Sequence, residues 1–225
     1  MLKEPPKSSS KQPPFEPPRY IAVEGPIRVG KSTLTRFLAD RMHARRILDC
    51  EDNPFLGDFY REKAGSAFRA QMYFLIERHR RLRDALASGT SGPVIADFLF
   101  EKDKIFAYLN LDNEELKLYE RYFERFSAEL PAPELVIYLQ ATPEVLRERI
   151  SRKAAPGESN ISQEYVEAVA KAYEHFFFRY SSSDLLVVNT SEIDFVNRSA
   201  DLQQLLRRLE APVKGTQYFL PLGSA

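Results

Sequence analysis

The sequence is poor in several features that would point to a particular class of protein. It contains one cysteine, Cys50, so it cannot form an internal disulfide and is compatible with a reducing compartment. Its 32 basic and 32 acidic side chains balance, which argues against a broad cationic face for nucleic acid. No apolar run reaches the ~18 residues of a membrane span, and the N-terminus shows no apolar signal segment. We therefore expect a cytoplasmic protein without membrane segments.

The composition changes along the chain and predicts one domain with a tail at each end. Residues 1–18 are rich in Pro, Ser and Lys and cannot form a packed core, so we expect a disordered tail. Apolar segments begin at Tyr20, and no Gly/Ser-rich linker interrupts the rest of the chain. The sequence thus predicts a single domain over residues 19–211, followed by a C-terminal extension over residues 212–225.

Short apolar runs alternate with amphipathic segments throughout the predicted domain. Five runs predict strands: "YIAVEG", "RRILD", "PVIADFLF", "ELVIYLQA" and "DLLVVNT". Helical periodicity is present in "LTRFLADRM" and at roughly 65–88, 113–128, 142–153 and 162–180. This alternation predicts an α/β fold in which helices cover both faces of a parallel sheet.

The segment "GPIRVGKST", residues 25–33, contains the complete pattern of a phosphate-binding loop. Gly25 and Gly30 allow backbone N–H groups to turn toward an anion, and the helix that follows adds partial positive charge. Lys31 would reach the β- and γ-phosphates, and the Ser32 hydroxyl would hold Mg²⁺. Because a strand precedes the loop and a helix follows it, the context predicts binding of a nucleoside triphosphate. Arg28 stands where a small residue would be easier to accommodate.

Acidic residues follow two of the predicted strands. Asp97 ends "PVIAD", while Asp49, Glu51 and Asp52 end "RRILDCED". Ligands bind at the carboxyl ends of parallel strands, where one carboxylate can hold Mg²⁺ and another can accept a proton during phosphoryl transfer. Acids at strand ends often simply meet solvent. We favour a function for Asp97 and for the group of three, in which no single member stands out.

Two polar residues lie on one face of the helix predicted for "AFRAQMYFLIERHRRL". Gln71 and Arg78 are seven residues apart, so they point the same way two turns apart. Their donors and acceptor could bind the edge of a flat heterocycle. A solvated face is an equally good interpretation, since further arginines surround Arg78.

A cluster of cations ends another predicted helix, in "LRERISRKAAPGE". Cations at a helix C-terminus interact favourably with the helix dipole, and this interaction alone could explain why they occur there. They could also form a lid that closes over the triphosphate. We favour the lid, because four cations occur within seven residues: Arg147, Arg149, Arg152 and Lys153.

Taken together, these segments resemble the deoxynucleoside kinases, especially bacterial deoxyadenosine/deoxyguanosine kinase-like proteins. The similarity runs from about Tyr20 to Phe195 and includes "IAVEGPIRVGKST", "NPFLGDFY", "QMYFLIER", "KDKIFA", "PELVIYLQATPEVLRERI" and "NTSEIDF". The resemblance implies a three-layer P-loop NTPase-type fold with a five-stranded parallel sheet, usually dimeric. It also implies transfer of the γ-phosphoryl group of ATP to the 5′-hydroxyl of a deoxynucleoside, with Mg²⁺.

The resemblance further implies roles for individual residues. Gln71 and Arg78, with Asp103, would bind the base, and Tyr60 and Glu158 would hold the sugar 3′-hydroxyl. Asp97 and Ser32 would position the metal. The loop "SEIDF" would lie against the adenine of ATP. The residues expected to bind ATP are Gly25, Arg28, Gly30, Lys31, Ser32, Thr33, Arg149, Arg152, Lys153, Asp194 and Phe195.

Three departures from the family pattern concern the acceptor site and the lid. The family's acid-Arg-Ser is here Asp97 followed by Phe and Leu, so an arginine is missing. The usual position of the catalytic glutamate is Leu48, which leaves Asp49 as the expected base and Glu51 in reserve. A second lid arginine is replaced by Ala155, for which Arg152 could compensate. We hypothesise that Arg28 partly replaces the arginine missing beside Asp97.

The predicted function is therefore ATP-dependent phosphorylation of a deoxynucleoside, most readily a purine one. Asp49 or Glu51 would accept the hydroxyl proton, while Lys31, Mg²⁺ and the lid cations neutralise the moving phosphoryl group. A nucleoside monophosphate kinase is one alternative, and it would need further cations to hold an acceptor phosphate. A nucleotide-binding regulator with decayed catalysis is another, motivated by Leu48 and the missing arginine.

Overall fold

A six-stranded parallel sheet forms the centre of the protein. The computed structural model describes residues 18–86, 92–153, 161–191, 193–195 and 197–219. The strand order is β2-β3-β1-β4-β5-β6 and every neighbouring pair is parallel. The strands are β1 (Tyr20–Glu24), β2 (Arg45–Ile47), β3 (Val94–Ala96), β4 (Leu135–Gln140), β5 (Asp184–Asn189) and β6 (Thr216–Phe219).

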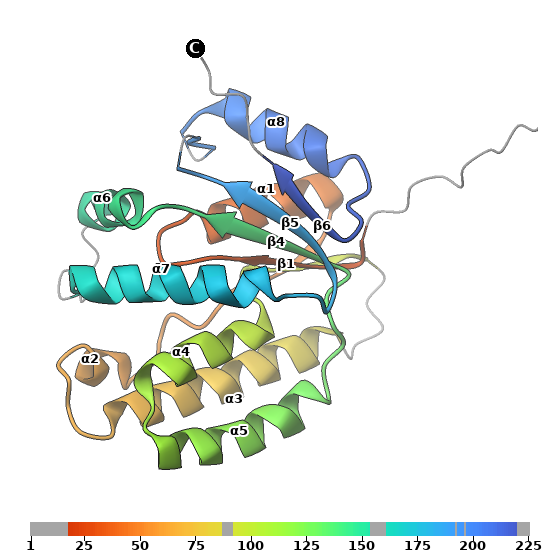
Figure 1. Cartoon of the computed structure of the whole chain (residues 1–225). Helices are drawn as coiled ribbons and strands as arrows, with labels where there is room; N and C mark the ends of the chain where they lie inside the picture. Colours follow the sequence, from red (N-terminus) through yellow and green to blue (C-terminus); the bar gives the residue numbers. More distant parts are fainter. Residues whose placement is uncertain (1–17, 87–91, 154–160, 192, 196, 220–225) are drawn as a thin grey trace, which may run out of the picture.

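Helices cover both faces of this sheet, as Figure 1 shows: α1 and α8 lie on one side, and α3, α4, α5 and α7 on the other. The described helices are α1 (Lys31–Met42), α2 (Leu56–Phe59), α3 (Ser66–Leu86), the 3₁₀ turn η1 (Phe100–Lys102), α4 (Asp103–Asn110), α5 (Asn113–Ser127), α6 (Pro143–Lys153), α7 (Gln163–Phe178) and α8 (Ser199–Leu209). The α/β expectation is therefore confirmed, and the four predicted helix ranges agree with α3, α5, α6 and α7 within a few residues.

The core lies on both sides of β1, whose five residues are all buried. Successive side chains of a strand point to opposite faces. Ile21 and Val23 accordingly join the cluster that contains Leu34 of α1. Ala22 joins the cluster that contains Tyr173 of α7. Burial on both faces explains why the strands appear in the sequence as nearly unbroken apolar runs.

The number of strands differs from the expectation of five. The sixth strand, β6, pairs with β5 and lies within the residues assigned to a C-terminal extension. It is a four-residue edge strand whose residues alternate between exposed and partly buried, so it lacks the apolar run used to identify the others. The proposed domain boundary at residue 211 stays a prediction, but part of the extension belongs to the sheet.

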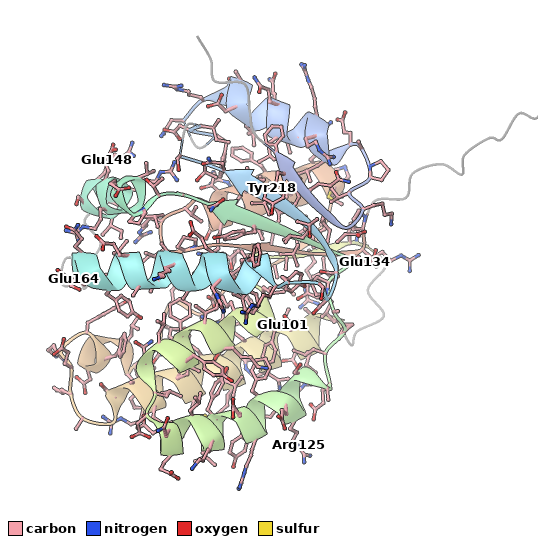
Figure 2. All side chains as sticks on the ribbon, viewed as in Figure 1. Glu101, Arg125, Glu134, Glu148, Glu164 and Tyr218 are labelled. Atoms are coloured by element: carbon pink, nitrogen blue, oxygen red, sulfur yellow. The ribbon has the colours of Figure 1, made fainter. Side chains whose placement is uncertain are left out.

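The exterior agrees with the balanced charge of the sequence. Figure 2 shows charged residues of both signs at the outside of the molecule, including Arg125 of α5 and Glu164 of α7. Within the described residues, no helix is both long and apolar enough to cross a membrane. The compartment stays a prediction.

Candidate functional site

The phosphate-binding loop connects β1 to α1 at the carboxyl edge of the sheet. Residues 25–30 form the loop, and Lys31 begins α1. The Lys31 amine donates to the carbonyl oxygens of Gly25, at 2.7 Å, and Pro26, at 3.0 Å. Burial and the charge of Lys102 lower the pKa of Lys31 to about 8, against the opposing effect of nearby carboxylates. The lysine amine is thus held against the backbone of the phosphate loop.

Two loop positions have unusual backbone conformations. Gly30 has φ 112°, and a Cβ there would come within 2.7 Å of the Phe195 ring, so only glycine allows the two segments to approach. Arg28 has φ 61°, a left-handed conformation that costs a non-glycine residue roughly 1–2 kcal/mol. An arginine kept in such a conformation at a ligand-binding loop is a candidate for a functional role.

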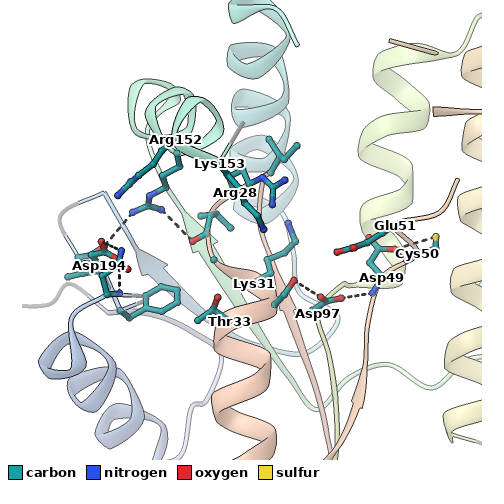
Figure 3. A pocket seen from close by; sticks show the side chains of 18 of the residues that line it. Arg28, Lys31, Thr33, Asp49, Cys50, Glu51, Asp97, Arg152, Lys153 and Asp194 are labelled. Atoms are coloured by element: carbon teal, nitrogen blue, oxygen red, sulfur yellow. Dashed lines mark hydrogen bonds between the residues drawn. The ribbon is translucent and has the colours of Figure 1, made fainter. Parts of the chain in front are cut away.

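A cleft of about 910 Å³ opens above this loop. In Figure 3, Arg28, Lys31, Arg152 and Lys153 surround one part of it, and Asp49, Glu51 and Asp97 surround another. The remaining predicted residues that line it are Gly30, Ser32, Thr33, Tyr60, Arg149, Asp194 and Phe195. The structure therefore brings most of the predicted ATP-binding and catalytic residues to one cleft.

The two strand-end acids are directly connected. Asp97 accepts a hydrogen bond from the Ser32 hydroxyl at 2.8 Å and another from the Asp49 backbone N–H at 2.6 Å. It is 4% exposed, so the alternative of a solvent-facing acid is wrong for this residue. This arrangement joins the phosphate loop to the end of β2, where the expected base lies.

Asp49 is held by two cations. Arg78 donates Nε to Oδ1 at 2.8 Å and Nη2 to Oδ2 at 2.9 Å, and the Lys102 amine lies 2.7 Å from Oδ2. Burial alone would raise the pKa of Asp49, but Arg78 and Lys102 outweigh it and hold that pKa far below its ordinary value. Asp49 is therefore a fixed, ionised carboxylate at neutral pH.

The other acidic candidates differ from Asp49. Glu51 lines the cleft but is exposed, and it makes no side-chain hydrogen bond or ion pair with the residues that the structure describes. Asp52 is exposed, lies 3.7 Å from Arg81 and is not among the lining residues. Leu48, at the family's usual glutamate position, is exposed and does not line the cleft either.

Gln71 and Arg78 of α3 point into the protein interior, each 4% exposed, so the alternative of a solvated face is wrong. Both donate to Asp103, the first residue of α4, which is fully buried. Tyr119 of α5 adds a hydrogen bond to Asp103 at 3.1 Å. Burial raises the pKa of Asp103 in spite of Arg78. These three predicted base-binding residues lie together beside Asp49 but do not line the cleft itself.

The cations of α6 fall into two groups. Arg149 donates to the Thr190 hydroxyl at 3.1 Å and to the Thr190 carbonyl at 2.6 Å, which links α6 to the segment after β5. Arg152 and Lys153 are exposed and line the cleft. Arg147 instead donates to the Ile161 carbonyl at 3.0 Å and does not line the cleft, so three of the four predicted lid cations line it. Their role as a lid stays a prediction. Ala155 and Glu158 lie outside the described residues.

Sequence reasoning missed two buried charged residues of this site. Glu24 ends β1 and is fully buried, and Lys102 ends η1 and is 3% exposed. Glu24 could have been identified by the same rule that identified Asp97, an acid at the end of an apolar run. No local pattern identifies Lys102, because its partner Asp49 is 53 residues away.

Comparison with known proteins is consistent with this geometry. A family model described as deoxynucleoside kinase matches residues 21–214. The chain is 32% identical over 195 residues to a deoxyguanosine kinase of Bacillus subtilis, covering 83% of this chain and 93% of the relative. It is 28% identical over 205 residues to a deoxyadenosine/deoxycytidine kinase of the same organism, covering 88% and 94%.

A solved structure has the same fold. The deoxyadenosine kinase of M. mycoides with bound dATP superposes with a TM-score of 0.73, at 23% identity, over 86% of this chain and all of that one. At this identity the similarity supports the fold alone.

Proposed function

The chain belongs to the deoxynucleoside kinase family, and on that premise we propose that it transfers the γ-phosphoryl group of ATP to the 5′-hydroxyl of a purine deoxynucleoside. Deoxynucleoside kinase activity follows from the family. The purine preference, ATP as donor, Mg²⁺ and the residue roles below are the parts that we propose.

One observation carries the proposal: a continuous line of hydrogen bonds from the phosphate loop to the predicted base-binding residues. It runs from Ser32 to Asp97, then to Asp49, Arg78 and Asp103. Phosphoryl transfer requires the phosphate-donor site and the acceptor site to adjoin each other, with an acidic residue between them that can accept the hydroxyl proton. Asp49 occupies that junction.

On the donor side, we assign the phosphates to the loop and the α6 cations. The loop N–H groups and Lys31 would bind the β- and γ-phosphates, and Arg28, Arg152 and Lys153 would approach from the cleft opening. Phe195 and Arg149 hold the loop after β5 against the phosphate loop, where the adenine would lie. These charges would be in place before the phosphoryl group moves, so little reorganisation is needed.

On the acceptor side, Asp49 would orient the 5′-hydroxyl and accept its proton. Because phosphoryl transfer passes through a loose transition state, the orientation of the carboxylate matters more than its basicity. Gln71, Arg78 and Asp103 would bind the base, and Tyr60, which lines the cleft, would bind the sugar. Because the base-binding trio is buried, the base would have to displace some of its internal hydrogen bonds.

Ser32 and Asp97 fit a magnesium ion. The Ser32 hydroxyl oxygen and Oδ2 of Asp97 are 2.8 Å apart, and Mg²⁺ takes oxygen ligands. This ion keeps several waters and needs few protein ligands, so one hydroxyl and one carboxylate would suffice to hold it. When bound, it would neutralise phosphate charge.

We expect the purified protein to phosphorylate deoxyguanosine and deoxyadenosine faster than deoxycytidine and thymidine. Relatives named for purine deoxynucleosides support this. Radiolabel transfer from ATP to the four nucleosides measures the preference. Equal or higher kcat/KM with the pyrimidines would contradict the purine assignment, and product with monophosphates alone would indicate a monophosphate kinase.

We also propose a homodimer. Large apolar side chains are exposed on the outer helices, including Tyr108 of α4, Tyr122 of α5 and Phe178 of α7, the last 86% exposed. The resemblance to the family implies a dimer, and these exposed side chains are the candidates for its interface. Sedimentation equilibrium should give twice the mass of one chain, and a mass equal to one chain at micromolar concentration would contradict the proposal.

A further inference from the structure

The two residues after Asp97 cannot supply the positive charge that the family pattern places there. Phe98 and Leu99 are both fully buried and pack in the hydrophobic clusters on the α3 and α7 side of the sheet. Any cation that assists Asp49 from this part of the chain must therefore come from farther along, where η1 turns back toward the end of β2.

Lys102 occupies that place. It is the last residue of η1 and is 3% exposed, so its amine has left water. The amine lies 2.7 Å from Oδ2 of Asp49 and 3.7 Å from Oε2 of Glu24. A buried ammonium group needs carboxylate partners, and Asp49 and Glu24 both lie within 3.7 Å of this one.

Glu24 fixes the other end of this arrangement. Its Oε1 accepts the Gly25 N–H at 2.8 Å and the Tyr173 hydroxyl at 3.1 Å, and its Oε2 accepts the Leu99 N–H at 2.7 Å. The carboxylate that holds the first glycine of the phosphate loop therefore also contacts Lys102. Lys102 thus connects the start of the phosphate loop to Asp49.

The charges of the cluster make Lys102 distinct from Arg78. Arg78 is shared between Asp49 and the fully buried Asp103. Lys102 is shared instead between Asp49 and Glu24. Lys102 and Arg78 thus both contact Oδ2 of Asp49, and Lys102 is the one that also contacts Glu24, on the side of the phosphate loop.

We propose that Lys102 is a positioning residue for phosphoryl transfer, which holds Asp49 toward the acceptor hydroxyl and supplies the positive charge that Phe98 and Leu99 cannot. This inference rests on the proposed role of Asp49. It concerns the chemical step, so the lysine should affect kcat much more than nucleoside binding.

The test compares Lys102→Met, Lys102→Arg and the matched control Lys104→Met. Lys104 lies two residues away and contacts the ring of Phe123 instead of the site. In Lys102→Met we expect kcat to fall about 100-fold, as for loss of one preorganised charge, with nucleoside affinity within about threefold of wild type. Lys102→Arg should recover at least about tenfold, because it restores the charge, and Lys104→Met should match wild type. Steady-state kinetics and equilibrium dialysis of labelled nucleoside provide the two readouts.

Several outcomes would overturn the inference. These are a wild-type kcat in Lys102→Met, no recovery with arginine, or a loss of nucleoside affinity as large as the loss of kcat. If Lys102→Met does not fold, the double variant Glu24→Gln/Lys102→Met is tested in its place, because it removes both charges of the pair. Failure of both to fold would show a structural role and overturn the proposal. A folded but inactive wild type would instead refute the proposed function.

Discussion

Replacing Asp49 with asparagine is expected to lower kcat/KM about 1,000-fold, within the range of 10²–10⁴ typical of general acid–base catalysis. Asparagine keeps the size of the side chain but loses the negative charge, so it can neither accept the hydroxyl proton nor satisfy both Arg78 and Lys102. Single-turnover phosphorylation of a deoxynucleoside with saturating ATP would measure the chemical step directly.

The matched control is Glu51→Gln. Glu51 lines the same cleft two residues farther on, but it is exposed and not held in place by the described residues. We expect its activity to stay within about threefold of wild type, since no transition-state interaction is removed. The reverse result, a large loss in Glu51→Gln and little in Asp49→Asn, would transfer the role of base to Glu51. Thermal unfolding and ATP affinity of both variants establish that the comparison concerns the chemical step.

Replacing Arg78 with methionine is expected to lower the free energy of unfolding by about 3–5 kcal/mol, the usual result of removing one partner of a buried ion pair. Arg78 is 4% exposed and pairs with both Asp49 and Asp103, and Asp103 is fully buried. Methionine fills much of the volume but leaves Asp103 with hydrogen bonds from Gln71 and Tyr119 alone. Urea unfolding of the variant and of wild type provides the measurement.

The loss should depend on pH in a defined direction. Burial already raises the pKa of Asp103, and removing Arg78 raises it further because a favourable charge is lost. A carboxyl whose pKa is raised in the folded state adds stability below its unfolded pKa, and this contribution is lost as pH rises through the folded pKa. Arg78→Met should therefore be destabilised less at pH 5.5 than at pH 7.5, and the opposite trend would contradict a charged, buried Asp103.

Arg80→Met is the control on the same helix. Arg80 is about half exposed and pairs with Glu77 one turn away, so its loss should cost at most about 1 kcal/mol. Equal losses in Arg78→Met and Arg80→Met would mean that the Arg78 pairs contribute no more than a surface ion pair. That result would remove the physical basis for a rigid acceptor site.

The sequence alone determined the features whose residues are close together along the chain. The phosphate loop is one contiguous segment, so its glycines, Lys31 and Ser32 identify it without knowledge of the fold. Strands buried on both faces leave apolar runs, and Asp97 follows such a run. Asp49 follows the short and mostly exposed β2. The positions of both acids at strand ends placed them at one edge of the sheet. The helical spacing of Gln71 and Arg78 showed that they share a face, but not whether that face meets solvent.

The tertiary structure decided the rest, because it depends on distances between residues far apart in the sequence. β6 could not be identified from its own four residues, since an edge strand has no fully buried apolar run and its existence depends on β5. The burial of Arg78 follows from the packing of α3 against α4 and α5, which brings Asp103 to it. Lys102 lies beside Asp49 only because η1 turns back after β3 toward the end of β2, which sets the local charge around the proposed base. Electrostatic interactions act over a few ångströms of space, whereas sequence patterns report only neighbours along the chain.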